Sequence, residues 1–185
     1  MGKMVLVTGG ARSGKSRYAE EIAMQAGGNV VFVATSVSTD EEMEYRIKMH
    51  KMNRPQYWET VEGYKDFDIL LEECIGCKDA VLVDCITMMV SNIMFEKCKD
   101  LEHISVSEAD EIEEYVKSEI SKLLKTAKSS DVKFIIVTNE VGMGVVPQTD
   151  SGRVFRDIAG RANQMIANTA DEVYLCVSGI PVKIK

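Results

Sequence analysis

The chain has little positive charge, few histidines and no long apolar run, and these shortages exclude several classes of protein. Its 22 Lys and Arg residues are outnumbered by 29 Asp and Glu residues, so the formal net charge is -7. Non-specific nucleic-acid binders need basic surface to replace the counterions of phosphates, so we expect no nucleic-acid partner. No window approaches the ~20 apolar residues that cross a bilayer, and the apolar run after Met1-Gly2-Lys3 is too short for a signal peptide. We therefore expect a cytoplasmic chain with no stable membrane insertion.

Cysteine chemistry is also poorly supported. The five cysteines are an odd number and lie scattered through apolar or helical stretches, at Cys74, Cys77, Cys85, Cys98 and Cys176. Cys74 and Cys77 have C-x-x-C spacing, but no second Cys or His pair completes a tetrahedral metal site. We expect buried, reduced thiols.

Short apolar runs alternate with longer helical segments along the chain. The expected strands are Met4–Thr8, Asn29–Thr35, Ala80–Cys85, Lys133–Thr138 and Glu172–Val177, with a short tail strand at Val182–Ile184. The expected helices are Lys15–Gln25, Asp40–Asn53, Tyr64–Glu73, Met88–Lys97, Glu108–Lys128 and Arg153–Thr169. Strands that alternate with helices imply parallel crossover units, so we predict one α/β domain over residues 1–185. The clearest helix is Glu108–Lys128, for which we predict Ser107 as the N-cap.

A glycine-rich loop follows the first expected strand and opens the first expected helix. Its sequence is Gly9-Gly10-Ala11-Arg12-Ser13-Gly14-Lys15-Ser16, which has the G-x-x-x-x-G-K-S spacing of a phosphate-binding loop. Glycines let backbone N–H groups approach phosphate oxygens, and the helix N-terminus adds a positive dipole end. We expect Lys15 to reach the β- and γ-phosphates of a nucleoside triphosphate. This context predicts a P-loop NTPase-type fold.

A magnesium ion beside such a loop needs a hydroxyl and an acidic group from a neighbouring strand. Ser16 supplies the hydroxyl, and Asp84 ends the apolar run that begins at Ala80. Glu140, just past another expected strand, is a weaker candidate. We predict Mg²⁺ as the cofactor, held by Ser16 and Asp84.

The chain has two histidines, and their surroundings differ. His103 lies in a polar, acidic stretch and is expected to be a solvated loop residue. His50 lies near the end of an expected helix, between Arg46 and Arg54, on a face shared with Met43 and Ile47. A neutral imidazole beside cations suits attack on a nucleotide α-phosphorus, although a hydrogen bond to a backbone carbonyl is the commoner role for such a histidine.

Several further segments, taken together, carry a family resemblance along nearly the whole chain. They are Val7–Ser16, Ala34–Ser36, Glu42-Met43, Arg46-Ile47 with His50-Lys51 and Arg54-Pro55, Trp58, Cys85–Thr87, Val137–Gly144, Phe155–Arg161 and Val177–Ile180. With these segments the chain resembles the bifunctional adenosylcobinamide kinase / adenosylcobinamide-phosphate guanylyltransferases of cobalamin biosynthesis. The resemblance implies phosphorylation of a corrinoid hydroxyl by ATP or GTP, followed by transfer of GMP from GTP with release of pyrophosphate.

The same resemblance implies specific residues and an assembly. His50 stands where the family carries GMP covalently, which favours the nucleophile over the structural histidine. It implies nucleotide contacts at Gly9, Gly10, Ala11, Arg12, Ser13, Gly14, Lys15, Ser16, Ala34, Thr35, Ser36, Lys51, Met52, Asn53, Arg54, Glu62 and Asp84. It also implies a recombinase-like, mostly parallel sheet flanked by helices on both faces, and a homotrimer. The stretch Lys97–Asp110 matches nothing in that pattern and is expected to be a variable surface insertion.

Two other functions remain compatible with the residues. One is a small-molecule kinase that has the phosphate loop but no guanylyltransferase activity. The other is a non-catalytic nucleotide switch whose partner is another protein. No general base for the kinase step can be named from the sequence.

Overall fold

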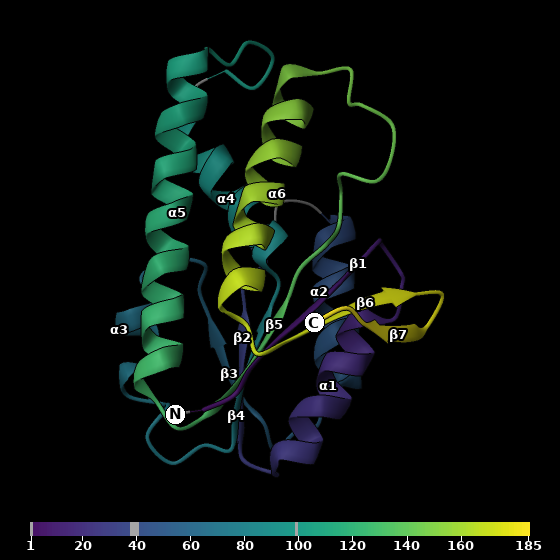
Figure 1. Cartoon of the computed structure of the whole chain (residues 1–185), viewed down its shortest axis with the longest axis vertical. Coiled ribbons are helices and arrows are strands. Elements are labelled where there is room, and N and C mark those ends of the chain that lie inside the picture. The colour runs from purple at the N-terminus through teal and green to yellow at the C-terminus, as the bar shows by residue number, and fades with distance from the viewer. Residues whose placement is uncertain (1, 38–40, 99) are drawn as a thin grey trace.

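The computed structural model describes residues 2–37, 41–98 and 100–185, without the side chains at positions 42, 43, 46, 47, 50 and 53. The elements, labelled in Figure 1, are β1 (Met4–Gly9), α1 (Lys15–Ala26), β2 (Val30–Ala34), α2 (Glu41–Asn53), β3 (Glu59–Glu62), α3 (Phe67–Glu72), β4 (Ala80–Asp84), α4 (Ile86–Lys97), α5 (Val106–Ser129), β5 (Lys133–Val137), α6 (Asp150–Thr169), β6 (Glu172–Val177) and β7 (Ile180–Lys183). No described helix combines the length and apolar composition that a membrane span needs.

The strands in the described residues form one seven-stranded sheet in the order β3-β2-β4-β5-β1-β6-β7. Every neighbouring pair from β3 to β6 is parallel, and only β6 and β7 pair antiparallel. Parallel neighbours need crossover connections, which the helices between the strands provide. The predicted mostly parallel α/β fold is confirmed.

Helices cover both faces of this sheet. Because side chains alternate across a strand, Leu6 and Val83 belong to a core cluster with residues of α3, α4, α5 and α6. Val5 and Leu82 belong to the opposite cluster, which contains the buried side chains of α1 and Trp58. Figure 1 shows α5 and α6 running side by side, in agreement with their mutual packing. The central strands are buried on both sides, which is why their sequences are continuous apolar runs.

The start of α5 differs from the prediction. The N-cap is Ser105, whose Oγ accepts from the backbone N–H of Glu108 while the Glu108 carboxylate accepts from the N–H of Ser105. This is a reciprocal capping box with the spacing S-x-x-E, so the prediction of Ser107 as the cap is wrong. The predicted insertion Lys97–Asp110 therefore contains the last residue of α4 and the beginning of α5.

Other elements also begin at residues that differ from the prediction, and one strand was not predicted. The helix α4 begins at Ile86 and α6 at Asp150, both earlier than predicted, and Thr149 Oγ1 caps α6. The missed strand, β3, has the sequence Glu-Thr-Val-Glu and pairs only with β2. An edge strand that is exposed along most of its length has no apolar run to reveal it. Residue 40, the predicted first residue of α2, lies outside the described chain.

All five cysteines are free thiols. Cys85 and Cys176 are buried as expected, whereas Cys77 is exposed, so the expectation of buried thiols is wrong for that residue. Burial raises the pKa of the Cys85 thiol to about 11, and the neighbouring Asp84 carboxylate adds to the shift. At neutral pH this thiol is protonated and unreactive.

Candidate nucleotide-binding site

The carboxyl edge of the sheet collects the residues that the sequence predicted separately. Strand β1 ends at Gly9, where the glycine-rich loop begins, and β2 ends at Ala34. Ala34 is in register with Glu62 of β3 on one side and with Asp84 of β4 on the other. Ligands of open α/β sheets bind outside the carboxyl ends of the strands. Of the predicted contacts, the start of the glycine-rich loop, Ala34, Glu62 and Asp84 therefore stand at the edge where a nucleotide is expected.

The glycine-rich loop turns sharply back before α1. Gly14 is the N-cap of α1 with φ 90°, a left-handed conformation that favours glycine, and Ser13 N–H donates to Gly10 O at 3.2 Å. The Lys15 side chain is 8% exposed, and its ammonium donates to the Gly10 carbonyl at 3.1 Å. The lysine thus lies against the arc of the loop, where its charge is available to phosphate oxygens.

The turn between β6 and β7 packs directly against this loop. Ser178 and Gly179 both have positive φ, as in a two-residue type I′ hairpin turn. Gly179 N–H donates to Ser13 O at 2.9 Å, and a Cβ on Gly14 would lie 3.0 Å from Gly179 Cα. The hairpin therefore supports the phosphate loop from a position about 165 residues later in the sequence.

Two hydroxyls at the loop are buried without a hydrogen-bond partner in the described residues. They are Thr8 Oγ1, just before the loop, and Ser13 Oγ, within it. A buried polar atom left unpaired costs about 1–3 kcal/mol. This arrangement suits a site whose ligand presents many oxygen atoms.

Asp84 ends β4, which is two positions away from β1 in the sheet. Strand β5 runs between β1 and β4, so the ends of the two strands are roughly 10 Å apart, which is two strand spacings. The helix α1 packs across β1, β5 and β4, and Ser16 stands in its first turn. Ser16 in the first turn of α1 and the half-buried Asp84 at the end of β4 are a hydroxyl and a carboxylate, ligand types that a magnesium ion bound to phosphates takes.

Glu20 is a neighbour of Asp84 that sequence reasoning missed. Burial raises the pKa of the Glu20 carboxyl, the negative charge of Asp84 adds to the shift, and Arg54 opposes it. The available signal was spacing, since Glu20 follows Ser16 by four residues and so lies one turn along the same face of α1. The carboxyl edge is more acidic than the motif alone suggested.

Arg54, a predicted nucleotide contact, is buried. Its guanidinium carbon lies 3.3 Å from the ring centroid of Phe32, and its Nη1 donates to Thr60 Oγ1 at 3.1 Å. Burial lowers the pKa of Arg54, while the carboxylates of Glu20, Asp84 and Glu62 raise it. Arg54 therefore holds the end of α2 against β2 and β3.

Thr35 is likewise turned away from solvent, whereas its neighbours are not. Thr35 is 1% exposed and its hydroxyl is bonded to the backbone of Cys85. Ala34 and Ser36 are half-buried at the same edge. Ala34 and Ser36 remain accessible to a ligand, and Thr35 does not.

The region around His50 is described only in part. His50 belongs to α2, one turn before Arg54, but its side chain lies outside the described part of the chain, as does that of Asn53. The predicted face shared by His50, Met43 and Ile47 also falls outside it. The neighbouring Lys51 ammonium lies 2.6 Å from Glu62 Oε1, with both side chains largely exposed. Among the other predicted contacts nearby, Met52 is exposed.

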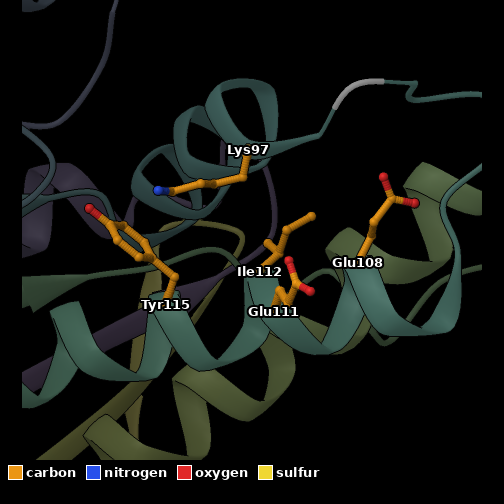
Figure 2. A pocket seen from close by; sticks show the side chains of 5 residues that line it. All are labelled: Lys97, Glu108, Glu111, Ile112 and Tyr115. Carbon is orange, nitrogen blue, oxygen red and sulfur yellow. The ribbon is translucent and has the colours of Figure 1, made fainter.

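A cavity of about 200 Å³ lies elsewhere, between the end of α4 and the start of α5 (Figure 2). It is lined by Lys97, Glu108, Glu111, Ile112 and Tyr115. The Lys97 ammonium lies 4.1 Å from the Tyr115 ring centroid, so the aromatic face is already occupied by a cation. None of the predicted nucleotide contacts lines this cavity, and the carboxyl edge remains the candidate site.

Comparison with known proteins agrees with this geometry. A family model described as cobinamide kinase / cobinamide phosphate guanyltransferase matches residues 5–184. The bifunctional adenosylcobalamin biosynthesis protein CobU of Escherichia coli is 44% identical over 187 residues, which cover 98% of this chain and 99% of that protein. Its namesake in Salmonella typhimurium is 46% identical over 182 residues, with the same coverage of both chains. CobP of Pseudomonas aeruginosa, also named as bifunctional, is 34% identical over 180 residues, which cover 97% of this chain and 96% of that protein. The chain belongs to the cobinamide kinase / cobinamide phosphate guanyltransferase family.

Proposed function

We propose that this chain phosphorylates the side-chain hydroxyl of adenosylcobinamide with a nucleoside triphosphate and then transfers GMP from GTP to the new phosphate. The observation that carries the proposal is the phosphate loop at the carboxyl edge of a sheet, in a chain that matches one bifunctional family from residue 5 to residue 184. We take residues 1–185 as one catalytic domain. A cytoplasmic location remains a prediction from the sequence.

The phosphate loop supplies the binding energy for both reactions. The backbone N–H groups of Gly9–Ser16 and the N-terminus of α1 favour anionic oxygens, and Lys15 adds a full positive charge. Phosphoryl transfer needs mainly positioning and charge neutralisation, both of which such a loop provides. For the kinase step, ATP and GTP present the same triphosphate to this loop.

Ser16 and Asp84 are the residues we assign to Mg²⁺. The described residues contain no cluster of three or more His, Cys, Asp or Glu side chains that would hold a metal alone. Mg²⁺ in such sites takes one or two protein oxygens together with substrate phosphates and water. The Ser16 hydroxyl and the Asp84 carboxylate fit that donor set, and the bound ion would neutralise charge on the β- and γ-phosphates.

For the second reaction we propose a covalent route through His50. An imidazole nitrogen attacks the α-phosphorus of GTP, a P–N bond forms, and the P–O bond to pyrophosphate breaks. A phosphate oxygen of the corrinoid product then attacks the same phosphorus, which forms the pyrophosphate linkage and returns the electron pair to the imidazole. The position of His50 one turn before Arg54, whose guanidinium is held on β2, supports this assignment.

Labelling with [α-³²P]GTP tests the proposal, and the chain offers a matched control. The sequence has two histidines, so His50→Ala and His103→Ala separate the nucleophile from a bystander. We expect the wild-type and His103→Ala proteins to gain an acid-labile, base-stable phosphoramidate, and His50→Ala to remain unlabelled. Phosphorylation of adenosylcobinamide should persist in His50→Ala.

The outcomes also separate the alternative functions. Kinase activity without any adduct would indicate a kinase alone, and nucleotide binding without turnover of a corrinoid would indicate a switch protein. A label that survives in His50→Ala would contradict the covalent assignment.

We further propose a homotrimer, with the corrinoid in a groove between subunits, because a domain of this size encloses little room for so large a substrate.

A further inference from the structure

Thr35 has every polar group engaged by its surroundings. Its N–H donates to Asp84 O at 3.2 Å, and its carbonyl accepts from Asn92 Nδ2 at 2.7 Å. Its hydroxyl accepts from Cys85 N–H at 2.7 Å and donates to Cys85 O at 2.8 Å. The residue is 1% exposed. A hydroxyl with one proton has no donor left for a nucleotide, so Thr35 acts on the protein.

The bonds made by Thr35 fall on the backbone that follows Asp84. On its N-terminal side, Asp84 is held by the pairing of β4 with β2 and β5. On its C-terminal side β4 ends and α4 begins at Ile86, so pairing between strands no longer restrains the backbone there. Thr35 forms hydrogen bonds with the Asp84 carbonyl and with the backbone N–H and carbonyl of Cys85. These bonds restrain the backbone where the strand pairing has ended. We call these bonds the Thr35 clasp.

Beyond Cys85 a buried polar network continues to the far side of the edge. Cys85 Sγ lies 3.1 Å from Thr87 Oγ1, which accepts from Asn139 Nδ2 at 2.6 Å. Asn163 Nδ2 on α6 donates to the Asn139 carbonyl at 3.1 Å. Connected hydrogen bonds of this kind, here buried or partly buried, favour one arrangement of the segment. Through these hydrogen bonds the turn after Asp84 is connected to the residues that follow β2 and β5, and to α4 and α6.

We propose that Thr35 is a positioning residue whose clasp holds the Asp84 carboxylate toward the phosphate loop, where it binds Mg²⁺. This inference rests on the proposed function, since it takes Asp84 as the metal ligand. Partners that orient a metal ligand typically change metal affinity by about 10- to 100-fold when removed.

The test compares Thr35→Val, which keeps the shape and removes the hydroxyl, with Thr35→Ser, which keeps the hydroxyl. The matched control is Thr126→Val, because the Thr126 hydroxyl donates within its own helix, α5, to the Lys122 carbonyl at 3.0 Å and belongs to neither the clasp nor its network. Calorimetry with a non-hydrolysable GTP analogue gives the affinity in EDTA and along a Mg²⁺ titration. Asp84→Asn is measured in parallel, and thermal unfolding reports folding for every variant.

We expect the Mg²⁺ concentration for half-maximal enhancement of binding to rise at least about tenfold in Thr35→Val. Thr35→Ser and Thr126→Val should titrate like the wild type, and affinity in EDTA should be unchanged in all of them. If Thr35→Val is not folded, Thr35→Ala is used, because the smaller side chain admits water without overpacking.

The contrary outcomes are distinguishable. A wild-type Mg²⁺ titration in folded Thr35→Val or Thr35→Ala, with a shifted one in Asp84→Asn, overturns the clasp and leaves the metal assignment standing. Loss of affinity in EDTA would make Thr35 part of the phosphate site itself and also overturn the clasp. An unshifted Asp84→Asn overturns both proposals.

Discussion

Gly9→Ala should strongly weaken nucleotide binding, because the structure leaves no room for a side chain at this position. A Cβ there would lie 2.6 Å from the carbonyl oxygen of Cys176 and 2.6 Å from Ser13 Oγ. Ser13 can rotate, but Cys176 cannot move away easily, since β6 pairs with β1 at Gly9 and with β7 at Pro181. The phosphate loop must therefore shift to relieve the contact.

The magnitude follows from the cost of that shift. Overpacking a closely packed interior costs about 1–3 kcal/mol, and here the displaced groups are the N–H donors that bind phosphate. Since about 1.4 kcal/mol is a tenfold change in affinity, we expect GTP to bind roughly ten- to hundredfold more weakly. Gly10→Ala is the matched control, because a Cβ on Gly10 meets nothing within 4 Å.

Isothermal titration with a non-hydrolysable GTP analogue at saturating Mg²⁺ measures both variants against the wild type. Thermal unfolding of each protein shows whether the shift also destabilises the fold. Equal GTP affinity in Gly9→Ala and Gly10→Ala would refute the reasoning, because it would mean that the loop absorbs a Cβ at Gly9 without moving its donors.

Two further predictions concern stability. Ser105→Ala should lower the free energy of unfolding by about 1 kcal/mol in urea titrations, because it removes the N-cap of α5, whereas Ser107→Ala should leave it unchanged; equal losses would contradict the assigned cap. The ammonium groups of Lys3 and Lys183 lower the pKa of Glu172 from 4.5 to about 2, so its stabilising contribution is full above pH 4.5 and is lost as pH falls toward 2. Glu172→Gln should therefore flatten the pH dependence of thermal stability in that window, and an unchanged slope would count against the ion pairs.

The parts of the fold that the sequence predicted correctly depend on local signals. The strands β1, β4 and β5 are apolar runs because helices cover both faces of the sheet. The phosphate loop was recognisable because its glycines, Lys15 and Ser16 are contiguous. Such features carry their full physical cause within a few residues, so no knowledge of distant partners was needed.

The features that were missed or misassigned depend on partners far away in the sequence. The hydrogen bonds between the Thr35 hydroxyl and Cys85, 50 residues later, have no signal in the sequence around Thr35. The support of the loop by Gly179 has no trace near Ser13. Strand β3 gave no apolar run because it lies at the sheet edge with mostly exposed side chains. In each case the tertiary arrangement decided the role of the residue.

The cations near His50 differ in how readily they can contact a nucleotide, and the tertiary structure causes the difference. From sequence, Arg54 and Lys51 were equivalent charges for an α-phosphate. Releasing Arg54 would break its stack on Phe32 and leave the ring of a core residue uncovered, whereas exposed ion pairs such as Lys51 with Glu62 are worth about 0–1 kcal/mol. Of these two cations, Lys51 is therefore the one that a nucleotide can recruit at small cost, and Arg54 keeps the end of α2 in place.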